Sequence, residues 1–143
     1  MTHAESILQR NCVTWFRLQY RAHALLLFAV PNGGRRNAKE AAIMRAEGVT
    51  PGVADLILLE PRGGFGALCI EMKTTGRYSR QSVSQRVWQS AAEDFGNRYV
   101  VVRTFEEFQE VVGDYMRQQP SFRVTVTFSD LQQGITSSKI AKQ

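Results

Sequence analysis

The chain has 143 residues, with 18 lysines and arginines against 13 acidic residues and a formal charge of +5. This length suits one domain with a full hydrophobic core, and the charge favours an anionic partner without proving one. The two cysteines lie in segments that look interior, which favours reduced thiols, and with the two histidines they lack the paired spacing of zinc sites. The apolar run 24–30 is too short to cross a bilayer, and the early Glu5 argues against a signal peptide.

Hydrophobic spacing and cap residues predict helices that alternate with strands along the chain. Thr2 and Glu5 are typical of a helix start, and Asn37 and Gly48 are typical of the two ends of a helix. The predicted elements are a helix from residue 3, a buried strand at 24–30, a helix at 37–47, strands at 52–59 and 67–73, a helix at 80–95, a buried strand at 99–102 and a helix at 105–115. This alternation indicates an α/β domain with a mixed sheet and helices on both faces.

The two central strands carry the most informative polar residues of the chain. Asp55 lies within the apolar segment GVADLILL at 52–59, and the next strand ends in Glu71-Met72-Lys73 after a glycine-rich turn. Because side chains alternate along a strand, Glu71 and Lys73 point to the same face. The sequence therefore predicts two carboxylates and an ammonium that converge on one place.

An ionised carboxylate in such an apolar strand is costly unless a positive group compensates it. A divalent cation that prefers oxygen ligands would do so, and an amine beside it suits phosphodiester hydrolysis. The alternative is an ion pair that holds the hairpin together, which contributes uncertainly to stability. Having all three residues on two joined strands favours the site over the ion pair.

These residues and the sequence around them resemble the PD-(D/E)XK nuclease superfamily and, within it, the VRR-NUC family. Ala54 stands where the superfamily name has proline, a departure of little weight because that residue is not a ligand. The likeness covers roughly residues 3 to 116. The matching segments are Pro31 to Gly34, Glu47 to Asp55, Glu71 to Arg77, Gln85 to Trp88 and Gly96 to Arg103.

The resemblance implies a restriction-endonuclease-like α/β core over residues 1–118 and a DNA endonuclease that depends on Mg²⁺ or Mn²⁺. Small members of the family are similar to structure-selective homodimers that act on branched DNA such as four-way junctions. A cytoplasmic location, in a bacterial or phage-infected cell, is the matching expectation. A catalytically silent DNA-binding module and a sequence-specific restriction-type nuclease are the alternatives.

The resemblance also implies roles for particular residues. Asp55, Glu71, Lys73 and Gln85 would be catalytic, and the metal ligands would be Asp55, Glu71, the Met72 carbonyl and Glu5. Glu5 is also explained as the third residue of a capping box, although it shares a helical face with core residues. Gln85 is either a solvated boundary residue or a hydrogen-bonding group beside the site. Trp88 is interpreted as a core residue.

Two basic segments are candidates for contact with a phosphate backbone. One is the glycine turn with its following arginines, and the other is the acid-free stretch after Lys73. A plain tight turn and a solvated loop explain them as well. The candidate DNA-binding residues are Asn32, Gly33, Arg35, Arg36, Arg77 and Arg80.

The C-terminal extension, residues 119–143, matches nothing in the family. Apolar and polar residues alternate over 122–128, which predicts a strand with one apolar face. Such a strand would pair across a dimer, extend the sheet or cover the core, and the sequence does not choose among them.

Overall fold

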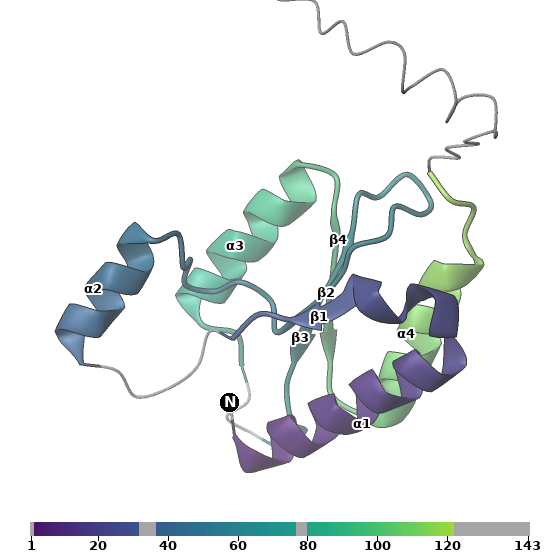
Figure 1. Cartoon of the computed structure of the whole chain (residues 1–143), viewed down its shortest axis with the longest axis horizontal. Helices are drawn as coiled ribbons and strands as arrows, with labels where there is room; N and C mark the ends of the chain where they lie inside the picture. The colour runs from purple at the N-terminus through teal and green to yellow at the C-terminus, as the bar shows by residue number, and fades with distance from the viewer. Residues whose placement is uncertain (1, 32–36, 77–79, 122–143) are drawn as a thin grey trace, which may run out of the picture.

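The computed structural model describes residues 2–31, 37–76 and 80–121 (Figure 1). The elements, in chain order, are α1 (His3–Gln19), the 3₁₀ helix η1 (Arg21–Leu26), β1 (Leu27–Ala29), α2 (Ala38–Ala46), β2 (Leu56–Leu58), β3 (Leu68–Met72), α3 (Val83–Asp94), β4 (Arg98–Val102) and α4 (Phe105–Arg117). Among these ranges, no helix combines the length and the apolar character that a membrane crossing requires.

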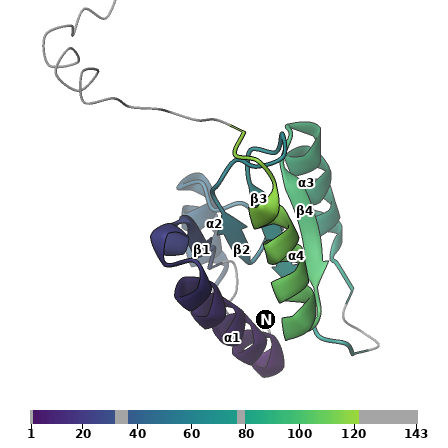
Figure 2. The ribbon, with the colours of Figure 1, turned by 90° about the vertical axis from the view of Figure 1, so that its right-hand side faces the viewer.

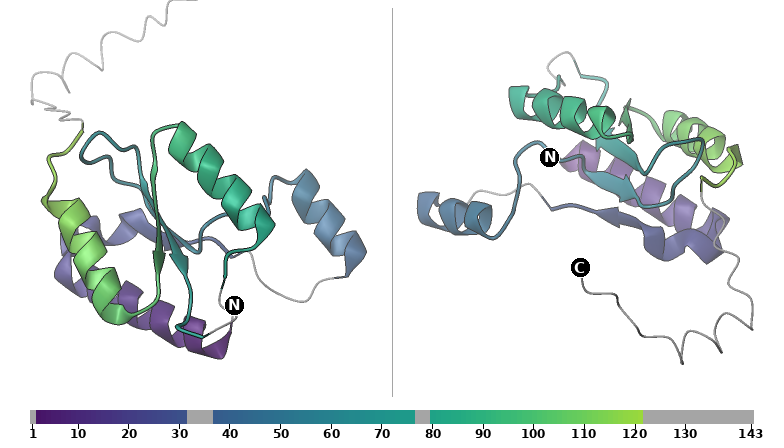
Figure 3. Two further views of the ribbon diagram at one scale, coloured as in Figure 1. Left: turned by 180° about the vertical axis from the view of Figure 1, so that it is seen from behind. Right: turned by 90° about the horizontal axis from the view of Figure 1, so that it is seen from above.

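The four strands form one mixed sheet in the order β1-β2-β3-β4. β1 and β3 both run antiparallel to β2, whereas β3 and β4 are parallel and are joined by α3. A parallel pair needs such a crossover because its ends lie at opposite edges of the sheet. The predicted mixed sheet with helices on both faces is therefore confirmed, as the views in Figures 2 and 3 show.

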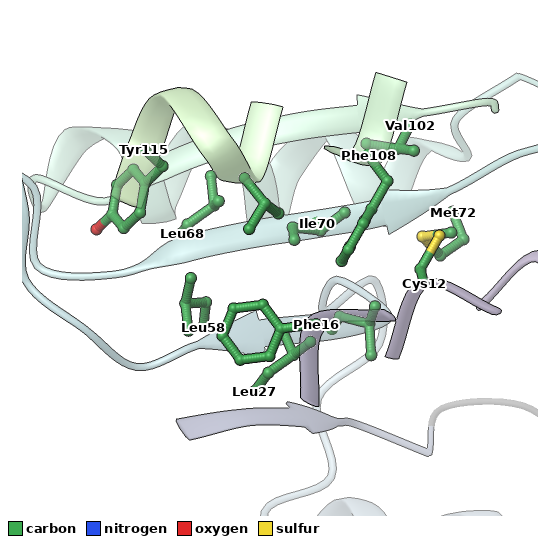
Figure 4. Packing of buried hydrophobic residues seen from close by; sticks show 12 residues of the cluster. Cys12, Phe16, Leu27, Leu58, Leu68, Ile70, Met72, Val102, Phe108 and Tyr115 are labelled. Atoms are coloured by element: carbon green, nitrogen blue, oxygen red, sulfur yellow. The ribbon is translucent and has the colours of Figure 1, made fainter. Parts of the chain in front are cut away.

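α1 and α4 cover one face of the sheet and build the larger core. Phe16, Phe108 and Tyr115 from these helices are fully buried against strand residues such as Leu68 and Ile70 (Figure 4). α3 covers the opposite face over β3 and β4, where the Trp88 ring lies 6.0 Å from the Tyr99 ring. Trp88 is thus a packing residue, as its helical spacing predicts.

The helix starts follow the capping residues of the sequence. Thr2, Asn37 and Ser82 each close a capping box at the start of α1, α2 and α3, and Thr104 caps α4. The apolar spacing predicts that this helix begins at residue 80. In the structure the Ser82 side chain accepts a hydrogen bond from the third helical residue, so α3 begins at residue 83. α2 ends before Gly48, whose φ of 101° suits a residue without a side chain.

Two strand predictions are wrong in extent. The segment 24–30 is not one buried strand, because η1 continues through Leu26 and only three residues form β1 at the sheet edge. Leu25, in η1, is 93% exposed, and Phe28 is 42% exposed. Phe28 pairs with Ile57 and so shares the sheet face that α3 covers, but α3 packs over β4, at the other edge of the sheet from β1. Strand β2 is shorter than 52–59, and Leu59 after it is 55% exposed.

α2 stands apart from the sheet and from the other helices (Figure 1), and none of its residues is buried. The predicted strand at 122–128 lies outside the described residues, as do Asn32, Gly33, Arg35, Arg36 and Arg77. Their proposed contacts therefore remain predictions.

Candidate active site

The antiparallel pairing of β2 and β3 brings Asp55 to Glu71. Leu56 pairs with Ile70, so Asp55, which immediately precedes β2, lies beside the C-terminal end of β3. The Asp55 Oδ2 atom accepts a hydrogen bond from the Met72 N–H at 2.8 Å. Asp55 thus lies one residue outside the strand in which the apolar pattern places it, but on the predicted neighbour.

Lys73 completes the group from the residue that follows β3. Its Nζ lies 2.8 Å from Glu71 Oε1, and the two side chains are 14% and 1% exposed. The Lys73 N–H donates to the Val102 carbonyl at 2.9 Å, which fixes this residue beside β4. Asp55, Glu71 and Lys73 are therefore brought together, as the strand alternation predicts.

Gln85 reaches the same carboxylate from the first turn of α3. Its Nε2 donates to Glu71 Oε1, while its Oε1 accepts the Ser82 N–H at 2.8 Å. Of the two alternatives for Gln85, the structure favours the position beside the site. A capping box holds the side chain there, so the helix start itself aims the amide at Glu71.

Gly52 allows the segment that leads to Asp55 to pack against the start of α3. Its φ is +86°, and a Cβ at this position would lie 2.3 Å from the Ser84 carbonyl oxygen. Any side chain would therefore push the segment and the helix apart. This close approach sets the distance between the strand that follows Asp55 and the helix that carries Gln85.

Glu5 combines the two roles that the sequence leaves open. Its Oε2 accepts the Thr2 N–H at 2.6 Å in a capping box, yet the residue is only 8% exposed. Burial raises the pKa of Glu5, but hydrogen bonds from Thr2 and the nearby charge of Lys73 outweigh burial, so the pKa lies below its usual value. Glu5 is thus an ionised carboxylate within electrostatic reach of the site.

Burial raises the pKa of both Asp55 and Glu71 above their usual values. For Asp55, the Met72 N–H and the Lys73 charge oppose this rise, and the charge of Glu5 adds to it. For Glu71, the hydrogen bond from Lys73 opposes the rise, and the charge of Asp55 adds to it. Among the described side chains, Asp55 is therefore repelled by Glu5 and repels Glu71, and the Lys73 ammonium acts on all three carboxylates.

This imbalance of charge fits a divalent cation. Carboxylate oxygens are the donors that Mg²⁺ and Mn²⁺ prefer, and a double positive charge would offset the repulsion between Asp55 and Glu71. In the described part of the chain, no group of three or more His, Cys, Asp or Glu side chains is arranged as a metal cage. The donor set that fits is thus two carboxylates with further oxygen ligands, rather than a cage of side chains.

Two polar residues near the site are absent from the predicted set. The Tyr99 hydroxyl lies 3.4 Å from Glu71 Oε2, and Arg103 donates to the Thr74 carbonyl at 2.8 Å, next to Lys73. Tyr99 is a phenol in a strand otherwise rich in valine, on the sheet face that Cys69 and Glu71 share. The sequence alone does not show that Tyr99 lies on the same face as Glu71, because this depends on the register between β3 and β4.

Arg80 is the DNA-contact candidate that falls within the described residues. It is exposed and precedes α3 by three residues, near the helix start that carries Gln85. Its place at this edge is compatible with a phosphate contact, and a solvated arginine explains it as well.

Comparison with solved structures identifies the fold. The chain is similar to a solved VRR_NUC domain protein with a TM-score of 0.72 and 23% sequence identity, over 84% of this chain and 93% of that one. No protein-family model matches the sequence, and no curated protein matches it. The likeness shows that the chain shares the fold of that VRR_NUC domain protein, in agreement with the predicted α/β domain of a mixed sheet flanked by helices.

Proposed function

We propose that this chain is a VRR-NUC-type endonuclease that hydrolyses DNA phosphodiester bonds with Mg²⁺ or Mn²⁺. The observation that carries the proposal is that Asp55, Glu71 and Lys73 lie together at the C-terminal end of β3. These residues form a buried group with an excess of negative charge, in a fold similar to that of a VRR_NUC domain protein. An oxygen-rich site of this kind beside an ammonium suits phosphoryl chemistry.

Asp55 and Glu71 are the principal metal ligands in this proposal, with the Met72 carbonyl and Glu5 as further oxygen donors. The ion, when bound, would lower the pKa of a water molecule and offset charge on the phosphate. The hydrogen bond from the Met72 N–H holds the Asp55 carboxylate at the end of β3. The capping box holds Glu5 at the start of α1, so each donor is fixed by backbone structure.

Lys73 and Gln85 act on the reacting groups rather than on the ion. Both donate to Glu71 Oε1 in the structure, so both have a hydrogen-bond donor at the edge of the site. Lys73 orients the attacking water or offsets the negative charge that develops on the phosphoryl oxygens. Gln85 hydrogen-bonds that water or the neighbouring phosphate. The products would carry 5′-phosphate and 3′-hydroxyl ends, as the family resemblance implies.

The proposed substrate is branched DNA, and the proposed active form is a homodimer. The net charge of +5 supports binding to a polyanion. Val83 and Val87 are 68% and 65% exposed on α3, and exposed apolar side chains of this kind support a contact with a second copy. Two active sites in one dimer would address two strands of a junction. The domain proper would comprise residues 1–118, with 119–143 as an extra strand or dimer arm.

The test is cleavage of labelled four-way junction, flap, single-stranded and linear duplex DNA, with Mg²⁺, with Mn²⁺ and with EDTA. Asp55→Asn and Lys73→Ala are the site variants. Asp114→Asn is the matched control, because Asp114 is an exposed carboxylate that pairs with the surface residue Arg117. We expect metal-dependent cleavage of branched DNA by the unsubstituted chain and the control, and none by the site variants.

Other outcomes separate the alternatives. Cleavage of linear duplex at a fixed sequence would indicate a restriction-type enzyme, and DNA binding without cleavage under either metal would indicate a silent module. Equal cleavage by Asp55→Asn and Asp114→Asn would refute the proposed site. Light scattering of the pure protein tests the homodimer separately.

A further inference from the structure

We infer that Arg103 forms a subsite for a backbone phosphate next to the phosphate that is cleaved. This assignment rests on the proposed function, since it requires a DNA strand that crosses the group around Asp55 and Glu71. Arg103 directly follows β4, and its charge takes no part in the proposed chemistry. Its place at the edge of the sheet, its hydrogen bonds and its lack of an acidic partner together point to a contact with substrate.

The ends of three neighbouring strands form a row at one edge of the sheet. Asp55 immediately precedes β2, Lys73 immediately follows β3, and Arg103 immediately follows β4. Met72 pairs with Val102 at the end of the ladder between β3 and β4, so Lys73 and Arg103 leave it side by side. Neighbouring strands are about 4.8 Å apart. The main chain of Arg103 therefore lies one strand from Lys73 and two strands from Asp55.

The Arg103 side chain reaches across to the segment that follows β3. Its Nη1 donates to the main-chain carbonyl of Thr74, the residue after Lys73, at 2.8 Å. Its main-chain N–H donates to Glu107 Oε2 at 2.6 Å, in the first turn of α4. The start of α4 thus holds the main chain of Arg103, and the Thr74 carbonyl holds its guanidinium beside the site.

The charge of Arg103 is not matched by an acid of the chain. Arg62 and Arg117 each form an ion pair with a carboxylate. Among the described residues, no carboxylate forms an ion pair with Arg103, and the partner of its Nη1 is a neutral carbonyl. The residue is only partly buried. A guanidinium has several N–H donors in a planar fork, so one bond fixes its plane and leaves other donors for an anion from outside.

A DNA strand supplies an anion at this place. Each nucleotide carries a phosphate, so the phosphate that is cut has neighbours along the strand. With the cut phosphate at Asp55 and Glu71, a strand that follows the row of strand ends brings a neighbouring phosphate to Arg103. Arginine binds phosphate oxygens through two parallel hydrogen bonds, and such contacts position DNA without reading its bases. The subsite would therefore fix the strand in the site without selecting a sequence.

The experiment measures how DNA binding by the full chain depends on salt. A fluorescein-labelled four-way junction is titrated by fluorescence anisotropy in EDTA at several NaCl concentrations, and KM and kcat are measured with Mg²⁺. For Arg103→Gln we expect Kd and KM to rise about tenfold, the effect of one charged hydrogen bond, with kcat little changed. The slope of log Kd against log salt should fall by about 0.9, the share of one phosphate contact on duplex DNA.

Arg103→Lys and Arg117→Gln are the matched variants. Lysine keeps the charge but lacks the planar fork, so Arg103→Lys should keep the salt slope and lose only part of the affinity. Arg117→Gln removes the same charge from the last turn of α4, whereas Arg103 precedes the first turn of that helix. It should leave Kd, KM and the salt slope unchanged.

An unchanged salt slope in Arg103→Gln would overturn the subsite and leave the proposed function standing. A lower kcat beside that unchanged slope would show that Arg103 acts through the segment after Lys73 instead. A slope that falls equally in Arg103→Lys and Arg103→Gln would also overturn the subsite, because the positive charge would not be what the DNA contacts. Absence of both binding and cleavage in the unsubstituted chain would overturn the proposed function and the subsite with it.

Discussion

Each end of the β2–β3 hairpin carries a buried acidic group, and the two groups differ in charge balance. Near the turn, Glu60 is 9% exposed, and its Oε1 atom forms an ion pair with the Arg62 guanidinium. The His23 Nδ1 atom lies 2.8 Å from Glu60 Oε2, but the geometry does not form a hydrogen bond. At the opposite end, Asp55 and Glu71 share Lys73 with Glu5.

The group around Glu60 is also tied to its surroundings. In addition to its contact with Glu60, the Arg62 guanidinium donates hydrogen bonds to the main-chain carbonyls of Met116 and Gln118. The Tyr115 hydroxyl donates to the Glu60 main-chain carbonyl at 2.7 Å. These bonds fasten the hairpin to the end of α4. The Glu60 carboxylate is thus matched in charge by the Arg62 guanidinium, and we assign this end of the hairpin a structural role.

The Asp55 end has the opposite character. The charge of Asp55 adds to the raised pKa of Glu71, and the charge of Glu5 adds to that of Asp55. Among the described side chains, the ammonium of Lys73 is shared by these carboxylates, so they outnumber their positive partner. Such a group costs stability and is retained where a site needs it. The comparison teaches that charge balance, rather than burial, distinguishes an ion pair that stabilises the fold from a group prepared for a cation.

The largest expected effect is the loss of cleavage when the unbalanced end is neutralised. Asp55→Asn should reduce metal-dependent DNA cleavage to background, because it removes a proposed ligand, while the free energy of unfolding stays equal or rises as a repelling charge is lost. Cleavage rates and chemical denaturation in EDTA check both parts. A variant that is both inactive and strongly destabilised would place Asp55 with the structural group.

Neutralising the balanced end should have the reverse outcome. Glu60→Gln leaves the buried Arg62 guanidinium without its carboxylate, so we expect the free energy of unfolding to fall by about 3 kcal/mol. Cleavage at a temperature where the variant is folded should be unchanged. Denaturation curves beside those of Asp114→Asn, a surface control, measure the loss, and a loss no larger than the control's would contradict the assigned role.

The pH dependence of stability should also separate the two ends. Folded Asp55 and Glu71 have pKa values above the usual 3.8 and 4.5, so the folded state keeps protons that the unfolded chain has released. Their contribution to stability is full below those usual values and is lost as the pH rises through the raised folded-state pKa values.

Denaturation in EDTA across this range should therefore show a loss of stability with rising pH that is smaller in the double variant Asp55→Asn, Glu71→Gln. Saturating Mn²⁺ should restore the unsubstituted protein at the upper end, because binding to the folded state alone stabilises it. Identical pH profiles for the protein and the double variant in EDTA would count against the raised pKa values.

The smallest expected effect concerns the hydroxyl that joins α4 to the balanced end. Tyr115→Phe removes the hydrogen bond to the Glu60 carbonyl and should lower the free energy of unfolding by about 1 kcal/mol. Cleavage should not change. If this variant lost as much stability as Glu60→Gln, the hydroxyl rather than the ion pair would be the main fastening of the hairpin.

Much of the fold follows from local signals in the sequence. The caps Thr2, Asn37 and Thr104 predict helix starts that the structure confirms, because a cap satisfies main-chain groups within its own turn. The prediction of one buried strand at 24–30 was wrong, because an apolar run fits a buried strand and a short 3₁₀ helix equally well. Its exposure depends on which elements cover the edge of the sheet.

The candidate site divides in the same way. Glu71 and Lys73 are joined by alternation along one strand, and Asp55 is joined to them by the antiparallel hairpin. Tyr99 could not be attached to the group in advance, since its place beside Glu71 depends on the parallel register of β3 and β4. Gln85 remained divided between two interpretations because both fit its position at the edge of a helix face.

The sequence by itself determined the order of elements, the helix caps and the pairing of acid and amine around one hairpin, because these depend on contacts a few residues apart or on side-chain alternation. Only the tertiary structure decided that Glu60 has its charge balanced and that Asp55 does not. It also decided that the Tyr99 hydroxyl lies beside one oxygen of Glu71. Charge balance is a sum over neighbours from distant segments, and those neighbours are known only once the strands and helices have packed.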